Sequence, residues 1–290
     1  MALLDFLDKR KQQTEKGGEM TFIDHLEELR WHIIRSVIAI MTGAVIVFIF
    51  IRKIVDKILF APADKNFIAN KWFCQLGNWL EDKVGFGSAI CLPGIDAKFQ
   101  ANTMTGQFIS SFTLAFMGGF IVAFPYVFWE FWKFVKPALS DKETKKTRGI
   151  VFWVSLLFFT GVFFGYFVLT PFMINFYFSY TLSDKIIVLP TFSDYMENLI
   201  YTTVGIGVLF QLPLLIYILA KIGLVTSAFL KKYWRHALVM ILIIAAIITP
   251  TTDPFSLGIV TIPLYLLYQA GIWITKRVER NKAKQMNERS

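Results

Sequence analysis

Apolar residues in this chain gather in long stretches that are separated by short and mostly basic connections. A helix that crosses a bilayer needs about 20 apolar residues, and most of these stretches reach or approach that length. The pattern therefore predicts an all-α membrane protein with six transmembrane helices, at His32–Ile51, Ile109–Phe131, Ile150–Thr170, Leu199–Ala220, Ala237–Thr249 and Phe255–Ile274.

The fifth stretch, Ala237–Thr249, is the shortest, and the sequence TPTTDP joins it to the sixth. We interpret these two as a tight hairpin whose first helix barely crosses. Four prolines interrupt the stretches or their edges, and kinked helices cannot pack as a straight bundle. A cupped bundle is therefore expected, with kinks near Pro125, Pro171, Pro213 and Pro263. Glycines such as Gly119 are expected to let helices approach closely.

Composition agrees with a membrane protein, because 55% of the residues are hydrophobic and only 18% are charged. Soluble domains carry about 25% charged residues. The net charge of +9 would suggest a nucleic-acid partner in a soluble protein, but here the basic residues lie in the connections. We expect a cytoplasmic tail at 1–20 without a cleavable signal peptide, one membrane domain at 21–275 and a basic cytoplasmic tail at 276–290.

The positions of Lys and Arg predict the topology. Most of the 30 lie before the first stretch, in the second-to-third and fourth-to-fifth connections, or in the C-terminal tail. The positive-inside rule then places both termini in the cytoplasm. Arg52, Lys53 and Lys57 conflict with this assignment, but they begin the large loop 52–107, and long loops follow the rule poorly.

Both cysteines of the chain, Cys74 and Cys91, lie in that loop, which the topology makes periplasmic. An oxidising compartment permits a disulfide, and closing this loop would stabilise the fold by roughly 3 kcal/mol. The alternative is two free thiols in a packed cap. A zinc site is not expected, because two sulfurs without a histidine are too few ligands.

The segment TFIDHLEELRWHII before the first stretch carries apolar residues at helical spacing. It predicts an amphipathic helix in the cytoplasmic interface that continues into the first span. Asp24 is the expected N-cap, with Glu27 as its capping-box partner. Glu28 has no such structural role and is a candidate for binding a cation, the alternative being a solvated helix face.

The second-to-third connection, FPYVFWEFWKFVKPALSDKETKKTRG, is dense in aromatic residues, which is typical of a membrane interface. Ser140 and Glu143 form a second predicted capping box. On the residues alone, capping is the favoured role of Glu143. Glu130 is expected to pair with Lys133 at i+3.

Polar residues inside spans are functional candidates. Gln211 stands near Pro213, and it either serves a function or makes an interhelical hydrogen bond that holds the bundle together. Asp253 precedes Pro254, and capping of the last helix explains it adequately. No metalloprotease, nucleophile-elbow or phosphate-loop motif is present, and no cofactor or metal is expected.

Five stretches resemble, in order, the TatC family, the multispanning subunit of the twin-arginine protein translocase. They are FIDHLEELRWHIIRS, FPYVFWEFWKFVKPALSDKE, FFTGVFFGYFVLTPF, GVLFQLPLLIYILAKIGLVTSAFLKKYWRHALV and ITPTTDPFS. The resemblance covers nearly all of residues 20–275. It implies a cupped six-helix bundle with a concave face open toward the bilayer.

The resemblance also implies particular residues. The family binds signal peptides with a pair of arginines, which two cytoplasmic acids hold, and these correspond to Glu28 and Glu143. Arg30 and Phe134 fall at positions that matter for signal-peptide recognition. Pro62 matches a functional periplasmic proline. The chain departs from the family at Gln211, where many relatives carry glutamate, and in its long first external loop with a cysteine pair.

The resemblance makes the chain a receptor without enzymatic activity in the inner membrane of a bacterium. It would bind twin-arginine signal peptides of folded proteins and recruit single-span TatA-type subunits, and TatB where present. Several copies are expected in the complex, which the protonmotive force drives. An ion-coupled secondary transporter of a small solute is the alternative, although the spans show no paired halves. A membrane-embedded enzyme is disfavoured by the missing motifs.

Overall fold

The computed structural model describes residues 22–64, 66–84, 91, 99–135, 147–179, 183, 189–248 and 254–287. Within these ranges the regular elements are helices, which turns and short irregular segments connect, and one isolated bridge joins Gln100 to Thr191. The elements are α2 (Phe22–Ile49), α3 (Ile51–Ile54), η1 (Val55–Leu59), η2 (Ala61–Ala63), α4 (Ile68–Val84), α5 (Gly106–Val135), α6 (Thr147–Phe164), η5 (Gly165–Leu169), α7 (Thr170–Ser179), α8 (Phe192–Leu209), α9 (Leu212–Ile222), α10 (Ser227–Lys232), α11 (Trp234–Ile248) and α12 (Pro254–Asn287).

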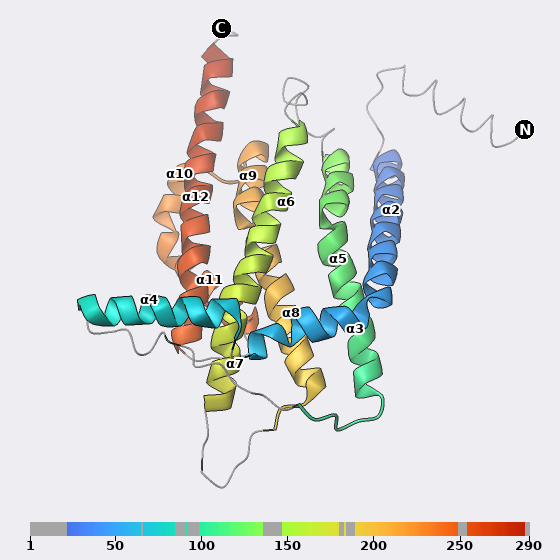
Figure 1. Ribbon diagram of the computed structural model, residues 1–290. Coiled ribbons are helices and arrows are strands. Elements are labelled where there is room, and N and C mark those ends of the chain that lie inside the picture. Colours follow the sequence, from blue (N-terminus) through green and yellow to red (C-terminus); the bar gives the residue numbers. More distant parts are fainter. Residues whose placement is uncertain are drawn as a thin grey trace, which may run out of the picture.

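Five helical segments in the described ranges are long and apolar enough to cross a membrane. They are Glu27–Ile49, Gly106–Val135, Gly149–Ser179, Phe192–Ile222 and Leu257–Lys284. The fifth predicted stretch forms the shorter apolar helix Trp234–Ile248, as its length suggested. The long segments lie side by side, and the start of α2 and the end of α12 are at the same end of the bundle, the upper end in Figure 1.

The first helix differs from the prediction at its N-terminal end. α2 is one continuous helix from Phe22 to Ile49, so the predicted segment runs into the first span without a break (Figure 1). Asp24 therefore lies inside the helix, and its predicted role as N-cap is wrong.

The prolines act differently from one another. Pro213 lies in the first turn of α9. The helix is interrupted at Phe210 and Gln211, which separate α8 from α9. Pro171 follows the π-helical turn η5, where the ladder of hydrogen bonds is already shifted. Pro125 and Pro263 lie inside the uninterrupted helices α5 and α12.

Helices α2 and α5 pack backbone against backbone at two glycines. A Cβ on Gly119 would come within 2.4 Å of the backbone nitrogen of Ala44, and one on Gly43 within 2.8 Å of the Gly119 carbonyl oxygen. Only glycine fits at such distances. The expected close approach at Gly119 is confirmed, and it holds α2 against α5 several helical turns below the upper ends of the two helices.

The large loop 52–107 is mostly helical where it is described, and its helices α3 and α4 lie near the height of the lower end of α2, above the lower ends of α5, α7 and α8 (Figure 1). Two tyrosine hydroxyls from other helices bind the segment η1 at the start of this loop. Tyr166 donates to the Ile58 carbonyl at 2.5 Å, and Tyr195 donates to the Leu59 carbonyl at 2.6 Å. Cys74 of α4 and Cys91 are joined by a disulfide, so the structure contains the bridge rather than two free thiols.

Helix α12 continues past its apolar part and fastens the connection between α9 and α10. The carboxylate of Glu279 accepts hydrogen bonds from the backbone N–H and the hydroxyl of Ser227, at 2.8 and 2.5 Å. The Lys282 ammonium donates to the carbonyl oxygen of Lys221 at 2.6 Å. The start of α10 and the end of α9 are therefore both held by the last helix.

Candidate functional site

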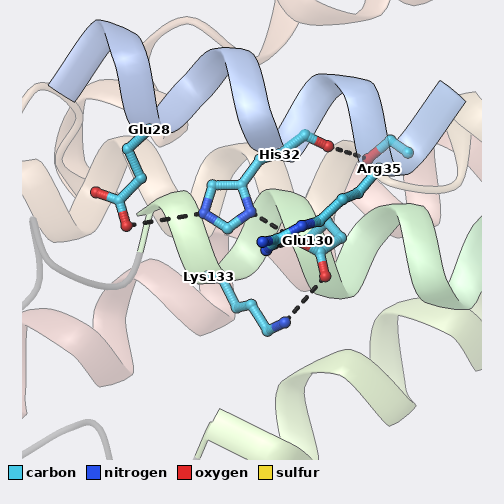
Figure 2. A network of polar contacts seen from close by, with 6 residues as sticks. Glu28, His32, Arg35, Glu130 and Lys133 are labelled. Carbon is cyan, nitrogen blue, oxygen red and sulfur yellow. Dashed lines mark hydrogen bonds and ion pairs between the residues drawn. The ribbon is translucent and has the colours of Figure 1, made fainter. Parts of the chain in front are cut away.

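The candidate site lies where the upper ends of α2 and α5 meet (Figure 2). Glu28, His32 and Arg35 follow one another at intervals of four and three residues, so they share one face of α2. Glu130 and Lys133 stand one turn apart on α5. The glycine contact described above holds these two helix faces close enough for their side chains to meet.

Glu130 is the centre of the network. Its side chain is 1% exposed, and its Oε2 accepts a hydrogen bond from Nδ1 of His32 at 2.6 Å. The Lys133 ammonium donates to Oε1 at 2.9 Å, and a guanidinium nitrogen of Arg35 lies 3.9 Å from Oε2. A buried carboxylate is tolerated only when it is paired and hydrogen-bonded, and three basic groups satisfy that requirement here.

Lys133 is fixed from a second side, because its ammonium lies 3.4 Å from the centroid of the Trp129 ring. This cation–π contact keeps the lysine directed toward Glu130. The predicted pairing of Glu130 with Lys133 is confirmed.

Glu28 forms the accessible edge of the network. Its side chain is 40% exposed, and its Oε1 lies 3.9 Å from Nε2 of His32, too far for a hydrogen bond. Arg30 and Glu27 are exposed on the same helix. Phe134 lies beside them, with its ring centroid 6.5 Å from that of His32 in an edge-on arrangement.

The chemistry of this arrangement follows from the difference between its two acids. The carboxylate of Glu130 is occupied by basic side chains of the protein itself. Glu28 faces solvent, and a carboxylate in that position can accept two parallel hydrogen bonds from a guanidinium group. The site is therefore suited to a basic ligand.

The other predicted site residues are not part of this cluster. This statement concerns Pro62 and Gln211 alone, because Glu143 and Asp253 lie outside the described residues. Pro62 is buried in η2 at the lower end. Gln211 lies at the break between α8 and α9, where its side-chain amide donates to the Val154 carbonyl of α6 at 3.3 Å. In the described part of the chain no group of three potential metal ligands occurs.

The sequence did not predict the partnership of His32 with Glu130. Only its local half is visible in the sequence, since His32 follows Glu28 by one helical turn. The contact with Glu130 spans 98 positions and depends on the packing of α2 against α5.

The fold and this site define a multi-pass α-helical membrane protein with an acidic, solvent-facing residue at one end of its bundle. Comparison with known proteins then identifies the family: the family described as "Sec-independent protein translocase protein (TatC)" matches residues 24–263. The chain therefore belongs to the TatC family, whose members are components of the twin-arginine protein translocase and act in protein transport.

Relatives and solved structures agree along nearly the whole chain. A Sec-independent protein translocase protein TatC from Blattabacterium sp. subsp. Periplaneta americana is 41% identical over 91% of this chain and 98% of its own length. The protein of the same description from Deinococcus radiodurans is 31% identical over 92% and 89%.

Two crystal structures titled as the twin-arginine translocase receptor TatC share the fold. One superposes with a TM-score of 0.66 at 26% identity, covering 86% of this chain and 98% of that chain. The other has a TM-score of 0.63 at 24% identity, covering 88% and 99%.

Proposed function

We propose that this protein is the core receptor subunit of a bacterial twin-arginine translocase. It binds the twin-arginine signal peptides of folded proteins at the upper end of α2 and α5 and recruits TatA-type subunits, with TatB where present, for export driven by the protonmotive force. In this proposal the chain crosses the inner membrane six times, with both termini in the cytoplasm, and the upper end of the bundle is cytoplasmic.

The observation that carries the proposal is the contrast between Glu28 and Glu130. A ligand arginine cannot be held by Glu130 without displacing His32 and Lys133, which already satisfy that carboxylate. Glu28 has a carboxylate at the surface and a fixed neighbour in His32. The network therefore supports Glu28 as the acid that pairs with one arginine of the signal peptide. Glu143, which lies outside the described residues, is proposed as the acid for the other arginine.

Phe134 extends the site with an apolar surface. Its edge-on contact with His32 places it next to Glu28, so a peptide whose arginine pairs with Glu28 can lay a neighbouring apolar side chain against the ring. Arg30 is exposed on α2 two residues from Glu28, on another side of the helix, and its part in recognition is proposed from the family resemblance.

Recruitment of the small subunits is proposed to involve the broken region between α8 and α9. Gln211 carries a buried side-chain oxygen that no described residue satisfies, although its amide nitrogen is bonded to the carbonyl of Val154. That interhelical bond supports a packing role for Gln211, and the partner contact is the less supported of the two. The secondary-transporter alternative is not favoured by the family match.

The deciding experiment is binding of a fluorescent twin-arginine signal peptide to the protein in detergent. We expect binding by the wild type, no binding of a Lys-Lys peptide, and at least tenfold weaker binding for Glu28→Gln and Glu143→Gln, which corresponds to losing one charged hydrogen-bonded pair of about 1.5–3 kcal/mol. The matched control is Glu27→Gln, which removes the same charge one position away. Equal affinity of folded wild type for both peptides would overturn the proposal.

A further inference from the structure

Helix α4 carries an exposed apolar stripe that the packing of the bundle does not use. Four large side chains recur at intervals of four, four and three residues, which places them on one side of the helix. Their exposed fractions are 65% for Ile68, 72% for Trp72, 49% for Leu76 and 57% for Trp79.

The same helix has a second side that is packed and a third that is polar. Ala69, Asn70 and Gly77 are buried, and the Phe73 ring lies 4.8 Å from that of Phe172 in α7. The disulfide at Cys74 adds a covalent attachment. Among the α4 side chains that the structure describes, the remaining exposed ones are polar or charged: Lys71, Gln75, Asn78, Glu81, Asp82 and Lys83. The stripe is thus a separate face of a helix that is already held in place.

Helix α4 lies across the spanning helices, at the level of the junction between α6 and α7 (Figure 1). A row of stacked rings leads from its start to the surface of that span. Phe67, just before α4, stacks on Phe167 at 5.7 Å, and Phe167 stacks on Phe163 at 6.1 Å. Phe163 is 59% exposed within the candidate span Gly149–Ser179, so it belongs to a surface that faces lipid.

The stripe also has the composition of a membrane interface. Tryptophan concentrates at the level of lipid headgroups, where its ring is apolar and its N–H is wet. Lys83 lies with its ammonium 5.2 Å from the Trp79 ring centroid, and a lysine there can bury its stem while its charge reaches a phosphate. A helix with one apolar side and one charged side that lies crosswise to the spans is typical of an interfacial helix.

From this placement we propose that α4 is an interfacial membrane anchor. Its side chains Ile68, Trp72, Leu76 and Trp79 insert into the leaflet at the lower end of the bundle, among the upper acyl-chain segments and glycerol groups of phospholipids. The inference requires only that the protein spans a bilayer, and it does not depend on the proposed binding of signal peptides.

The test compares two positions two residues apart on α4. Leu76→Cys places a thiol on the stripe, and Asn78→Cys places one on the polar side. Each variant is labelled with a small fluorophore without reductant and placed in lipid nanodiscs, and mass spectrometry verifies that Cys74 and Cys91 remain bridged. Quenching is measured with nitroxide lipids labelled in the upper acyl chain and with iodide in solution.

We expect the lipid nitroxide to quench the label at position 76 severalfold more than the label at 78, and iodide to show the reverse order. Equal quenching of both labels by iodide would place the stripe in water and overturn the proposal. Protection of the label at 76 from both quenchers would also overturn it, because the stripe would then be covered by protein. Leu76 is 49% exposed and Asn78 is also exposed, so both labels are attached at surface positions of α4.

Discussion

His32 and Glu130 join the first and second long helices through a hydrogen bond of 2.6 Å between side chains that are both largely buried. Lys133 and Arg35 lie near the Glu130 carboxylate, and Glu28 lies near the other nitrogen of the His32 ring. The two helices are thus joined by a close backbone contact at the glycines and by a polar contact that orients the His32 ring. Because Glu28 stands at its edge, the geometry of the proposed receptor site depends on a residue that does not itself face the ligand.

Replacing Glu130 tests this dependence. Glu130→Gln leaves three basic groups around a neutral amide, and breaking a buried ionic network costs about 3–5 kcal/mol. We expect a clear fall in the thermal unfolding temperature in detergent, with Glu27→Gln unchanged because Glu27 is exposed. A double-mutant cycle of His32→Ala and Glu130→Ala should give a coupling energy of about 0.5–3 kcal/mol. Additive effects would show that the bond contributes nothing.

The glycine contact between α2 and α5 gives a steric prediction. Gly119→Ala puts a methyl group 2.4 Å from the Ala44 backbone, which cannot move aside as a side chain can, so the helices must separate. We expect loss of folded protein, measured by size-exclusion yield. Gly149→Ala is the matched control, since nothing lies within 4 Å of its added Cβ, and its yield should equal that of the wild type.

The disulfide predicts a redox-dependent stability. Cys74 and Cys91 are 17 positions apart, and loss of a crosslink over such a loop costs roughly 3 kcal/mol in the chain-entropy model. The Cys74→Ser/Cys91→Ser variant should be cleaved by protease in the loop faster than the oxidised wild type. Reductant should bring the wild type to the rate of the variant, and an unchanged wild-type rate would contradict a stabilising bridge.

Replacing Gln211 tests whether its side chain serves the packing of the helices or the binding of a partner subunit. If the amide serves packing, Gln211→Leu loses one interhelical bond of about 0.6 kcal/mol, and export of a twin-arginine reporter in cells should continue. Loss of export in a variant of normal stability would instead assign Gln211 to a partner contact. Gln211→Glu is a useful companion, because it places an ionisable carboxyl group at the same position with little change in size.

Glu279 provides a prediction for the last helix. Glu279→Ala leaves the N–H and the hydroxyl of Ser227 without their acceptor, so the start of α10 should fray. Hydrogen exchange in α10 should become faster while exchange in α5 is unchanged. Equal exchange of wild type and variant in α10 would show that water replaces the carboxylate without cost.

The spanning helices were predictable from sequence because their signal is local and long. The stretch that became α5 holds a sustained apolar run around Pro125, and the family motifs placed Glu28 and Phe134 at the upper end. The pairing of Glu130 with Lys133 was equally local, at one helical turn. The first residue of α2 was predicted less well. The capping pattern suggested a start after Asp24, whereas the helix begins at Phe22.

What the sequence could not give were the contacts made by packing. The meeting of His32 with Glu130 needs the glycine contact far down the same helices, and nothing near either residue indicates it. The stripe on α4 has a local signal in the spacing of Trp72, Leu76 and Trp79, but the same spacing is also found in helices that bury such a stripe against other helices. Whether this stripe is exposed depends on which side of α4 packs against the rest of the protein, and the sequence of α4 does not show that.

The shortness of α11 has a consequence for the lipid around it. Fifteen helical residues, Trp234–Ile248, rise about 22 Å at 1.5 Å per residue, whereas the hydrocarbon core is about 30 Å thick. A bilayer that meets this helix at both ends has to thin by roughly 8 Å, or admit headgroups and water into that depth. If α11 crosses the bilayer as proposed, either response would lower the energetic cost of bringing polar groups into the bilayer along that flank of the molecule.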